Sequence, residues 1–525
     1  MTHPDSRSWT AAALLGLLTF ALYGSFLSYA PPGLHQHEVF FGLHAQAVAK
    51  SGRDLDGRLL PLYFLIKLNG LDLWFHPILI YATAPWLMVL PLSTTALRLP
   101  TAFVATLNVV FVYVLARRMC GRTSIALLAG ALLALTPAHF LMGRLADNHV
   151  YLATFILGWL MCMLPAGEMR PWRLLAAGVI GGIGIYSYLG ALLMMPVCLA
   201  LTFASLVIYD RDHAISGSAA AAIGFAALLV PLAVWLSGHP GAFNALAGRY
   251  EVYDPAHTTA VEGILGLGRW SSVVQRVGVY LDYFHPRFLL VRGDISPVDS
   301  TSKSGVLLIP TFVLALAGGY RVLRMRPVPK AWALVLALIV FAPLPGAFVG
   351  EAFNISRALV LLPCVALLAA AGFDALWRAG GRARTSAVLL LVLVPLQFGY
   401  FYRDYMGHYR LRVSHWLGAN AAPAFDRLID QAAAPATAPV YLSEAIPFVD
   451  FRWRLYLIER HREPLLTRTA LMTLDGVLAL PREAIVLSNF DDATERALLA
   501  DGFQRIAAIP DIDGAPSLAV LTRYR

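Results

Sequence analysis

Long apolar stretches alternate with short polar turns along most of the chain. The first stretch, Trp9 to Ala30, has no charged residue and is long enough to cross a bilayer core of about 30 Å. Further stretches of this kind cover residues 99–119, 125–142, 151–165, 172–188, 191–209, 219–236, 305–323, 331–349, 358–377 and 385–402. The pattern therefore predicts a polytopic α-helical membrane protein with about eleven transmembrane helices.

The apolar run from Pro77 to Leu92 is left out of this set because it is short and also contains Pro85 and Pro91. Counting it as a span would move every later loop to the opposite side of the membrane. The arginine clusters would then lie outside the cytoplasm, which the positive-inside rule disfavours. We therefore expect this run to lie along the membrane interface. The same rule predicts a cytoplasmic N-terminus, with the long loops 31–97 and 237–303 and the C-terminal tail on the outer face.

Hydropathy falls from residue 403 onward. Short β-like runs at 440–443, 484–488 and 517–522 alternate with helix-like stretches such as 491–501, which is typical of a small α/β domain. We find no catalytic motif there. The predicted organisation is a transmembrane domain with two large periplasmic loops, followed by a periplasmic α/β domain; the ranges are 1–402, with loops 31–97 and 237–303, and 403–525.

Composition supports a membrane protein. The 525-residue chain is 58% hydrophobic and 14% charged, against roughly 25% charged residues in soluble domains. Its net charge of +9 comes from short basic clusters between apolar segments, which indicates membrane topology rather than nucleic-acid binding. The four cysteines lie within or beside predicted helices and imply no disulfide framework.

The first long loop gathers ionisable residues directly after a predicted span. They are His35, His37, Glu38, His44, Asp54 and Asp56. Ionisable groups at a membrane surface are costly to desolvate and mark a functional site by default. We take Glu38 as the centre of that site; the alternative is that Glu38 only pairs with a loop arginine such as Arg53.

An ordered series of motifs in this region resembles bacterial members of glycosyltransferase family 39. The motifs are His37-Glu38-x3-Gly42-x2-Ala45, the run from Ser51 to Phe64, Pro77-x3-Tyr81, Leu97-Arg98-Leu-Pro100, Gly143-Arg144-Leu-Ala-Asp147, the run from Tyr283 to Asp294, and Ser356-Arg357-Ala-x4-Leu-Pro363. This family is related to the protein O-mannosyltransferases and to the lipid A aminoarabinose transferase. The resemblance covers roughly residues 30 to 375 and implies the GT-C fold.

The resemblance also implies an activity. The family takes sugar from a polyprenyl-phosphate donor and transfers it, with inversion, to an acceptor on the outer face of the membrane. The predicted protein is thus a glycosyltransferase of a bacterial inner membrane whose acceptor is an envelope lipid, glycan or protein. A lipid phosphate leaves without protonation, so one base and a few cations would suffice. The alternatives are a lipid-linked-sugar transporter or flippase, and a non-catalytic sugar-lipid binding protein.

This chain departs from the family at the position of the catalytic base. The family has Asp-Glu at the two positions that are His37 and Glu38 in this chain. Three hypotheses follow: Glu38 is the base, His37 is the base with its ordinary pKa near 6.5, or Asp147 or Asp54 reaches the site. We favour Glu38. A divalent metal bound by His37, Glu38 and His44 is a further alternative.

The resemblance and the residue chemistry also nominate binding residues. Arg144, Arg292 and Arg357 are predicted to bind the donor phosphate, although each could instead pair with Asp147, Asp294 or Glu351. Residues predicted to contact the substrate are Asp54, Trp74, His76, Tyr81 and Asp294. The aromatic members of this set could instead form an interfacial belt.

Overall fold

The computed structural model describes residues 6–68, 71–165, 170–242, 266, 268–433 and 438–523. The chain divides into two compact units. We call Met1–Ser25, Arg58–Tyr81 and Leu99–Arg403 the helical unit, and Phe26–Gly57, Ala82–Arg98 and Asp404–Arg525 the mixed unit. Part of the second predicted loop, residues 243–265 and 267, lies outside the described residues.

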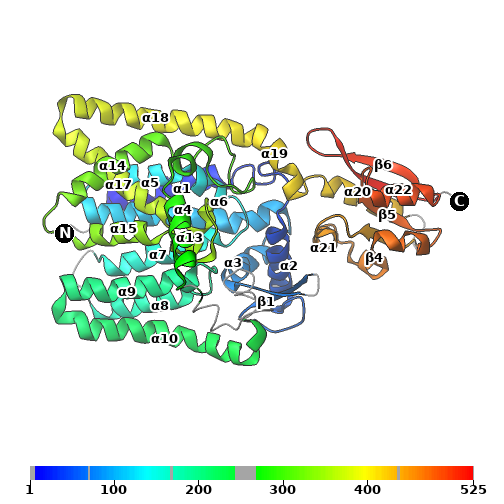
Figure 1. Cartoon of the computed structure of the whole chain (residues 1–525), viewed down its shortest axis with the longest axis horizontal. Coiled ribbons are helices and arrows are strands. Elements are labelled where there is room, and N and C mark those ends of the chain that lie inside the picture. The colour runs from blue at the N-terminus through cyan, green and yellow to red at the C-terminus, as the bar shows by residue number, and fades with distance from the viewer. Residues whose placement is uncertain are drawn as a thin grey trace. The chain divides into compact units, whose positions relative to one another are not determined.

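The helical unit consists mainly of long apolar helices (Figure 1). They are α1 (Ser6–Gly24), α4 (Thr94–Cys120), α5 (Thr123–Ala134), α6 (Pro137–Met142), α7 (His149–Met163), α8 (Pro171–Gly184), α9 (Ala191–Tyr209), α10 (Ala214–Gly238), α13 (Trp270–Asp282), α14 (Ile309–Leu323), α15 (Lys330–Phe341), α16 (Leu344–Val349), α17 (Leu361–Ala379) and α18 (Gly381–Met406). Helix α4 begins and α18 ends in segments assigned to the mixed unit.

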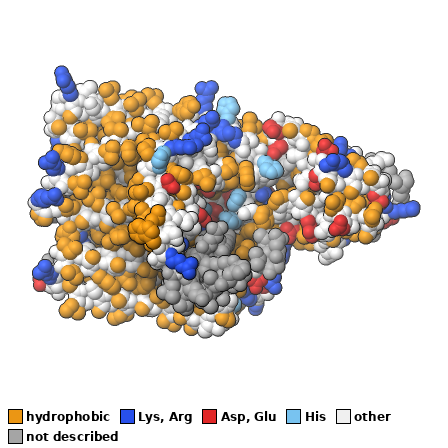
Figure 2. All heavy atoms as spheres, in the orientation of Figure 1, with side chains coloured by type: hydrophobic (Ala, Val, Ile, Leu, Met, Phe, Trp, Pro, Cys, Tyr) orange, Lys and Arg blue, Asp and Glu red, His pale blue; other side chains and the backbone are white. Residues whose placement is uncertain are grey.

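Among the described residues, 6 helices are long and apolar enough to cross a membrane, and four shorter apolar helices accompany them. The long ones are 94–120, 191–209, 211–238, 330–349, 361–379 and 381–406. Only 17% of the most apolar window of 211–238 is buried, and Figure 2 shows hydrophobic side chains spread over the visible face of the helical unit. Such exposed apolar helices are typical of a lipid-facing surface. The chain is a multi-pass membrane protein.

Two predicted spans differ in detail from the structure. The stretch 125–142 is two helices, α5 and α6, and 331–349 is likewise divided into α15 and α16. Proline stands in the first turn of each second helix, at Pro137 and Pro345, where its missing N–H and fixed φ start a helix but cannot continue one. The run from Pro77 forms only the short helix α3 (Pro77–Leu87).

Glycines bring two pairs of helices into close contact. A side chain on Gly318 of α14 would collide with a backbone carbonyl of α17, and one on Gly372 of α17 would collide with a carbonyl of α14. Gly178 of α8 and Gly224 of α10 are related in the same reciprocal way. Small residues at such crossings let helix backbones approach closely. The van der Waals contacts formed there stabilise helix association inside a membrane.

The C-terminal part of the mixed unit is an α/β fold. Its elements are α19 (His408–Leu417), α20 (Ala421–Ala433), β3 (Val440–Ser443), α21 (Val449–Glu459), β4 (Thr469–Met472), β5 (Ile485–Asn489), α22 (Ala493–Ala500), β6 (Gln504–Pro510) and β7 (Pro516–Thr522). The strand order is β4-β3-β5-β7-β6. Strand β3 pairs in parallel with β4 and β5, whereas β5 with β7 and β6 with β7 are antiparallel. A small C-terminal mixed sheet is thus present, as the sequence predicted.

Alternation along the strands gives this sheet two packed faces. Leu487 of β5 and Val520 of β7 pack with Trp453 of α21 on one face. Val486 and Leu521 pack with Leu498 of α22 on the other. Both faces are therefore covered by helices, and the sheet has its own hydrophobic core.

The first long loop is structured. Helix α2 (Gln36–Ser51) belongs to the mixed unit and packs on α21, where the Phe40 ring lies 5.6 Å from that of Phe448 and 4.9 Å from that of Phe451. Strands β1 (Phe64–Leu68) and β2 (Leu71–Phe75) form an antiparallel hairpin in the helical unit, with Phe64 opposite Phe75. The loop predicted over 31–97 thus contains two helices and a hairpin.

Candidate active site

Helix α2 begins at a capping box that includes Glu38. His35 is the N-cap residue, and its Nδ1 accepts the His37 N–H at 3.4 Å, while the His35 N–H donates to Oε2 of Glu38 at 2.8 Å. Each of these bonds satisfies a backbone donor that a helix start would otherwise leave unpaired. Glu38 therefore helps to define where the helix starts.

The carboxylate of Glu38 also forms a two-pronged ion pair with Arg98 of α4. Nε of Arg98 lies 2.7 Å from Oε1 of Glu38 and Nη2 lies 2.8 Å from Oε2, and both side chains are 0% exposed. The remaining guanidinium N–H groups donate to the carbonyls of Leu27, Pro31 and Gly33 at 2.6 to 2.7 Å. A guanidinium has five N–H donors, and all five are used inside the fold. The partner of Glu38 is thus Arg98, not Arg53.

The histidines of this loop lie close to Glu38 in sequence but differ in exposure. His37 is partly exposed, and its ring centre lies 4.9 Å from that of His35 and 6.4 Å from that of Phe41. His44 is buried on α2. Because Glu38 already accepts three hydrogen bonds, the imidazoles are the better metal ligands of the predicted His37, Glu38 and His44 set.

Asp54 lies in the turn that follows α2. The helix ends at Gly52, whose φ of 69° is left-handed, a conformation that glycine adopts without strain. The Asp54 side chain is buried and accepts the N–H of Asp56 at 3.0 Å. This contact gives Asp54 a turn-forming role within the mixed unit.

The helical unit contains a second arginine–glutamate pair. Arg357 ends a short 3₁₀ turn, Ile355–Arg357, that Asn354 caps. Its Nε and Nη2 donate to the two carboxylate oxygens of Glu351 at 2.7 and 2.9 Å, and its Nη1 donates to Oη of Tyr188 at 2.6 Å. The side chains of Arg357 and Glu351 are 10% and 37% exposed. The Glu351 side chain is therefore accessible and Arg357 is slightly exposed, in contrast to the fully buried Arg98–Glu38 pair.

Asp147 lies near this second pair. Its Oδ1 accepts the N–H of Asn148 at 2.6 Å and lies 3.8 Å from Nε2 of His149. The His149 ring in turn meets the Tyr188 ring edge-on, with ring centres 5.0 Å apart. Asp147, His149, Tyr188, Arg357 and Glu351 thus form one polar cluster in the helical unit.

The other two predicted phosphate-binding arginines occupy different environments. Arg144 is fully buried, and its Nη1 donates to the carbonyls of Tyr23 at 2.7 Å and Ser25 at 2.8 Å. Its guanidinium also lies over the Phe140 ring, 5.1 Å from the centre. Arg292 is exposed at the end of a π-helical turn, Arg287–Arg292. Accessibility therefore favours Arg357 and Arg292 over Arg144 for contact with an anion.

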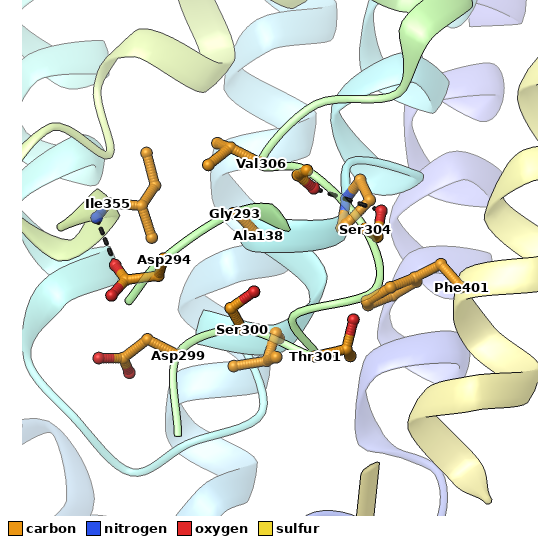
Figure 3. A pocket seen from close by; sticks show the side chains of 13 residues that line it. Ala138, Gly293, Asp294, Asp299, Ser300, Thr301, Ser304, Val306, Ile355 and Phe401 are labelled. Atoms are coloured by element: carbon orange, nitrogen blue, oxygen red, sulfur yellow. Dashed lines mark hydrogen bonds between the residues drawn. The ribbon is translucent and has the colours of Figure 1, made fainter. Parts of the chain in front are cut away.

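A small cavity with room for about one water molecule lies beside the Arg357 turn and is lined by both polar and apolar residues. Figure 3 shows Asp294, Asp299, Ser300 and Thr301 around it, with Phe401 at the opposite side. The Asp294 side chain is buried, and its carboxylate accepts the N–H of Ile355 at 2.5 Å and that of Ser296 at 2.8 Å. Burial, and then the neighbouring Asp299, raise the pKa of Asp294 well above its ordinary value.

The predicted aromatic contacts lie around the β1–β2 hairpin. The ring centre of Trp74 lies 5.0 Å from that of Trp235, and the Arg58 guanidinium lies over Trp74 at 5.1 Å. His76 is buried against Tyr63, with ring centres 5.5 Å apart. The hydroxyl of Tyr81 donates to the carbonyl of Pro61 at 2.7 Å. These side chains fasten the hairpin to neighbouring segments of the helical unit.

Comparison with known proteins connects this geometry to a family. Residues 76–236 match the family model described as dolichyl-phosphate-mannose-protein mannosyltransferase. This segment of the chain is therefore similar to that glycosyltransferase family. The match supports the resemblance predicted from the motifs.

Solved structures show the same fold. The ArnT crystal structure from Cupriavidus metallidurans bound to undecaprenyl phosphate is 16% identical and covers 98% of both chains, with a TM-score of 0.57. The apo form of that ArnT is similar at a TM-score of 0.54, with 15% identity and 98% of both chains covered. The oligosaccharyltransferase AglB from Archaeoglobus fulgidus, in complex with an inhibitory peptide and a dolichol-phosphate, has 12% identity and a TM-score of 0.50, covering 94% of this chain and 71% of its own. No curated protein matches significantly in sequence.

Sequence reasoning found several of the polar residues of the candidate site but missed four. Arg98 occurs in a quoted motif without a role, because its partner Glu38 is 60 positions away in sequence. His149 and Tyr188 join the Arg357 cluster from the start of α7 and from the segment between α8 and α9. Arg452, which contacts the loop before α2, lies in a domain that shows no recognisable motif.

Proposed function

We propose that the chain transfers a sugar, with inversion, from a polyprenyl-phosphate donor to a cell-envelope acceptor. The family match over residues 76–236 and the ArnT-like fold over nearly the whole chain support this function. Two similar structures hold undecaprenyl phosphate or dolichol-phosphate, which supports a donor of that class. The acceptor would be a lipid, a glycan or a protein.

We also propose the finer architecture that the sequence predicts. We assign the eleven predicted spans to the 6 long helices of the described residues together with α1, α5, α7, α8 and α14. The end of the helical unit at Arg403 supports a domain boundary at 402/403, while Phe26–Gly57 and Ala82–Arg98 belong to the mixed unit. The positive-inside rule places the N-terminus in the cytoplasm, and the two long loops and the C-terminal domain in the periplasm of a bacterial inner membrane.

Arg357 is the best candidate for the donor phosphate, with Arg292 as a second cation. An accessible guanidinium can offer two parallel N–H groups to a phosphate. Because Glu351 is 37% exposed, its hydrogen bonds to Arg357 can be exchanged for those of an incoming anion at small cost. Tyr188 would keep the guanidinium oriented during this exchange. Asp294, whose carboxylate accepts the N–H of Ile355, supports the turn that carries Arg357.

For the base, the contacts of Glu38 favour His37. Glu38 is buried and accepts two N–H groups from Arg98 and one from His35, so its protonation would leave a buried guanidinium unpaired. We therefore propose Glu38 as a positioning residue and the partly exposed His37 as the base, with Asp147 as the alternative. A partly exposed imidazole can accept the proton of an acceptor hydroxyl.

The test is transfer of radiolabelled sugar from synthetic polyprenyl-phosphate sugars in proteoliposomes. Parent protein should transfer label, and His37→Ala should lower kcat by about 100-fold while the KM for donor stays within about twofold. Retained kcat in His37→Ala with loss in Asp147→Asn would move the base to Asp147. Absence of transfer by the parent with every donor, together with movement of lipid-linked sugar across the bilayer, would overturn the transferase in favour of a flippase.

A further inference from the structure

We propose that the C-terminal α/β domain is a positioning element of the His37 loop and acts through Arg452. The proposal extends the proposed function, because it assigns a role to a domain without catalytic motifs. All contacts that support it lie within the mixed unit.

Arg452, in the first turn of α21, joins two parts of the chain. Its Nη1 donates to the carbonyl of Leu34 at 2.6 Å and to that of Leu417 at 2.9 Å. The N–H of Leu34 donates to the same Leu417 carbonyl at 2.9 Å. One guanidinium nitrogen therefore connects the end of α19 to the residue directly before the N-cap of α2.

Glycines allow this close approach. A side chain on Gly33, whose φ is +67°, would meet backbone atoms of Ala419 at 2.9 Å. A side chain on Gly418, whose φ is +56°, would collide with the Arg452 guanidinium. Both positions combine a left-handed backbone with no space for Cβ, a combination that only glycine tolerates. The loop before α2 is thus seated directly on the α19–α20 turn.

The placement of Arg452 on helix α21 explains why this domain can hold the loop firmly. Helix α21 follows β3, and Trp453, next to Arg452, is fully buried in the domain core. Burial lowers the pKa of Arg452 to about 10, which still leaves it protonated at neutral pH. A charged donor on a helix anchored in a hydrophobic core is a rigid support for loop carbonyls.

Three arginines from different elements hold this loop: Arg98, Arg452, and Arg410 of α19, whose Nε donates to the carbonyl of Tyr29 at 2.7 Å. Arg98 of α4 binds the carbonyls of Leu27, Pro31 and Gly33 as well as Glu38, and Arg452 binds the next carbonyl along, that of Leu34. His37 lies three residues after Leu34, at the start of α2. Releasing Arg452 would let the turn that carries His37 move while the Arg98–Glu38 pair stays intact. Arg452 is therefore a positioning residue, not a catalytic one.

The experiment is hydrogen exchange on the full chain in nanodiscs, comparing Arg452→Met with Arg460→Met. Arg460, the C-cap residue of the same helix, pairs with Asp426 at 3.4 Å and donates to the Tyr456 hydroxyl at 2.9 Å. These contacts lie within the C-terminal domain, so Arg460 is a matched control. Arg452→Met should speed exchange of peptide 33–38 roughly tenfold and leave β3 and β5 at the parent rate. Arg460→Met should leave both regions unchanged.

Parent-like exchange of peptide 33–38 in a folded Arg452→Met would overturn the proposal. If Arg452→Met also loses protection across β3 and β5, a second variant is needed. Gly33→Ala displaces the loop without changing the domain core. In Gly33→Ala, faster exchange confined to peptide 33–38 supports the proposal, and parent-like exchange of that peptide overturns it.

Kinetics separate this inference from the proposed function. In the transfer assay, Arg452→Met should lower kcat with the KM for donor unchanged, and Arg452→Lys should restore part of kcat. Faster exchange with an unchanged kcat would overturn positioning of the catalytic turn. If the parent transfers no sugar at all, the proposed function fails, whereas the exchange data still decide whether the domain holds the loop.

Discussion

The two units contain the same pair of side chains in opposite settings. Arg98–Glu38 and Arg357–Glu351 are both two-pronged ion pairs through Nε and Nη2, with N···O distances between 2.7 and 2.9 Å. The first pair is 0% exposed on both sides, whereas the carboxylate of the second is 37% exposed. The remaining N–H groups of Arg98 bind backbone carbonyls, while Nη1 of Arg357 binds the Tyr188 hydroxyl.

This difference separates a structural arginine from one that can bind a ligand. A buried pair with every donor satisfied cannot release a donor without leaving a buried charge unpaired. An accessible pair can exchange one anion for another, because solvent compensates the carboxylate that is released. Motif position alone does not distinguish the two, since both arginines belong to motifs of the same family resemblance.

The largest expected effect is on the buried pair. Arg98→Leu leaves the Glu38 carboxylate buried without its partner and removes three bonds to backbone carbonyls, so it should destabilise the chain by about 3 to 5 kcal/mol. The measurement is unfolding in detergent by denaturant, with Arg357→Leu as the control. A parent-like unfolding midpoint for Arg98→Leu would contradict the comparison, because the buried pair would then contribute no more to stability than the accessible pair.

The second effect is on catalysis. Arg357→Gln should lower kcat/KM for the polyprenyl-phosphate donor by about 10- to 100-fold, the usual contribution of hydrogen bonds to a charged group. Its apparent Tm should change by less than about 2 °C. Arg378→Gln is the control, because Arg378 forms a comparable but distant pair with Asp374 at 3.0 Å. Equal transfer rates for the two variants would remove Arg357 from the site.

A third, smaller effect concerns the support of the Arg357 turn and depends on pH. Asp294, which accepts the Ile355 N–H, has a pKa raised by burial and by Asp299. A raised carboxyl pKa stabilises the fold at low pH, and this contribution is lost as pH rises through the folded-state value.

Asp299→Asn lowers that folded-state pKa and removes the repulsion between the two carboxylates. The variant should therefore gain more stability over the parent at pH 8, by about 1 kcal/mol, than at pH 4, because the raised pKa of Asp294 favours its protonated form at low pH and weakens the repulsion. Thermal unfolding at both pH values measures this, with Asp511→Asn in the C-terminal domain as control. A larger gain at pH 4 than at pH 8 would contradict the assignment.

The smallest effect sharpens the role of Glu351. In this account the Glu351 carboxylate competes with the donor phosphate for Arg357. Glu351→Gln removes the negative charge of this competitor but keeps a side chain that can hydrogen-bond Arg357. Donor affinity should rise by about two- to fivefold, as measured by titration of a polyprenyl-phosphate sugar. A large loss of affinity would mean that Glu351 orients Arg357 rather than competing with the donor.

Much of the fold could be predicted because hydropathy determines it. The span predicted over 191–209 coincides with α9 at both ends, and the strand predicted over 440–443 coincides with β3. Strands β4 and β6 were missed because they are sheet edges with few buried residues. Their burial patterns lack the alternation on which strand prediction depends.

The candidate site was harder to predict than the fold. Local motifs indicated Glu38 and Arg357, but the partner of each side chain decides its role, and partners come from distant segments. Arg98 lies 60 residues from Glu38, and Tyr188 lies 169 residues from Arg357. Burial is equally invisible in a loop sequence, which is why Arg144 and Arg357 looked alike before their surroundings were known.

The central claim is that the accessible pair, and not the buried one, binds the donor phosphate. The most direct test is equilibrium binding of undecaprenyl phosphate to the purified protein in nanodiscs, which involves neither base nor acceptor. The account predicts about 10- to 100-fold weaker binding for Arg357→Gln, with Arg378→Gln equal to the parent. Binding that is unchanged in Arg357→Gln would contradict the account.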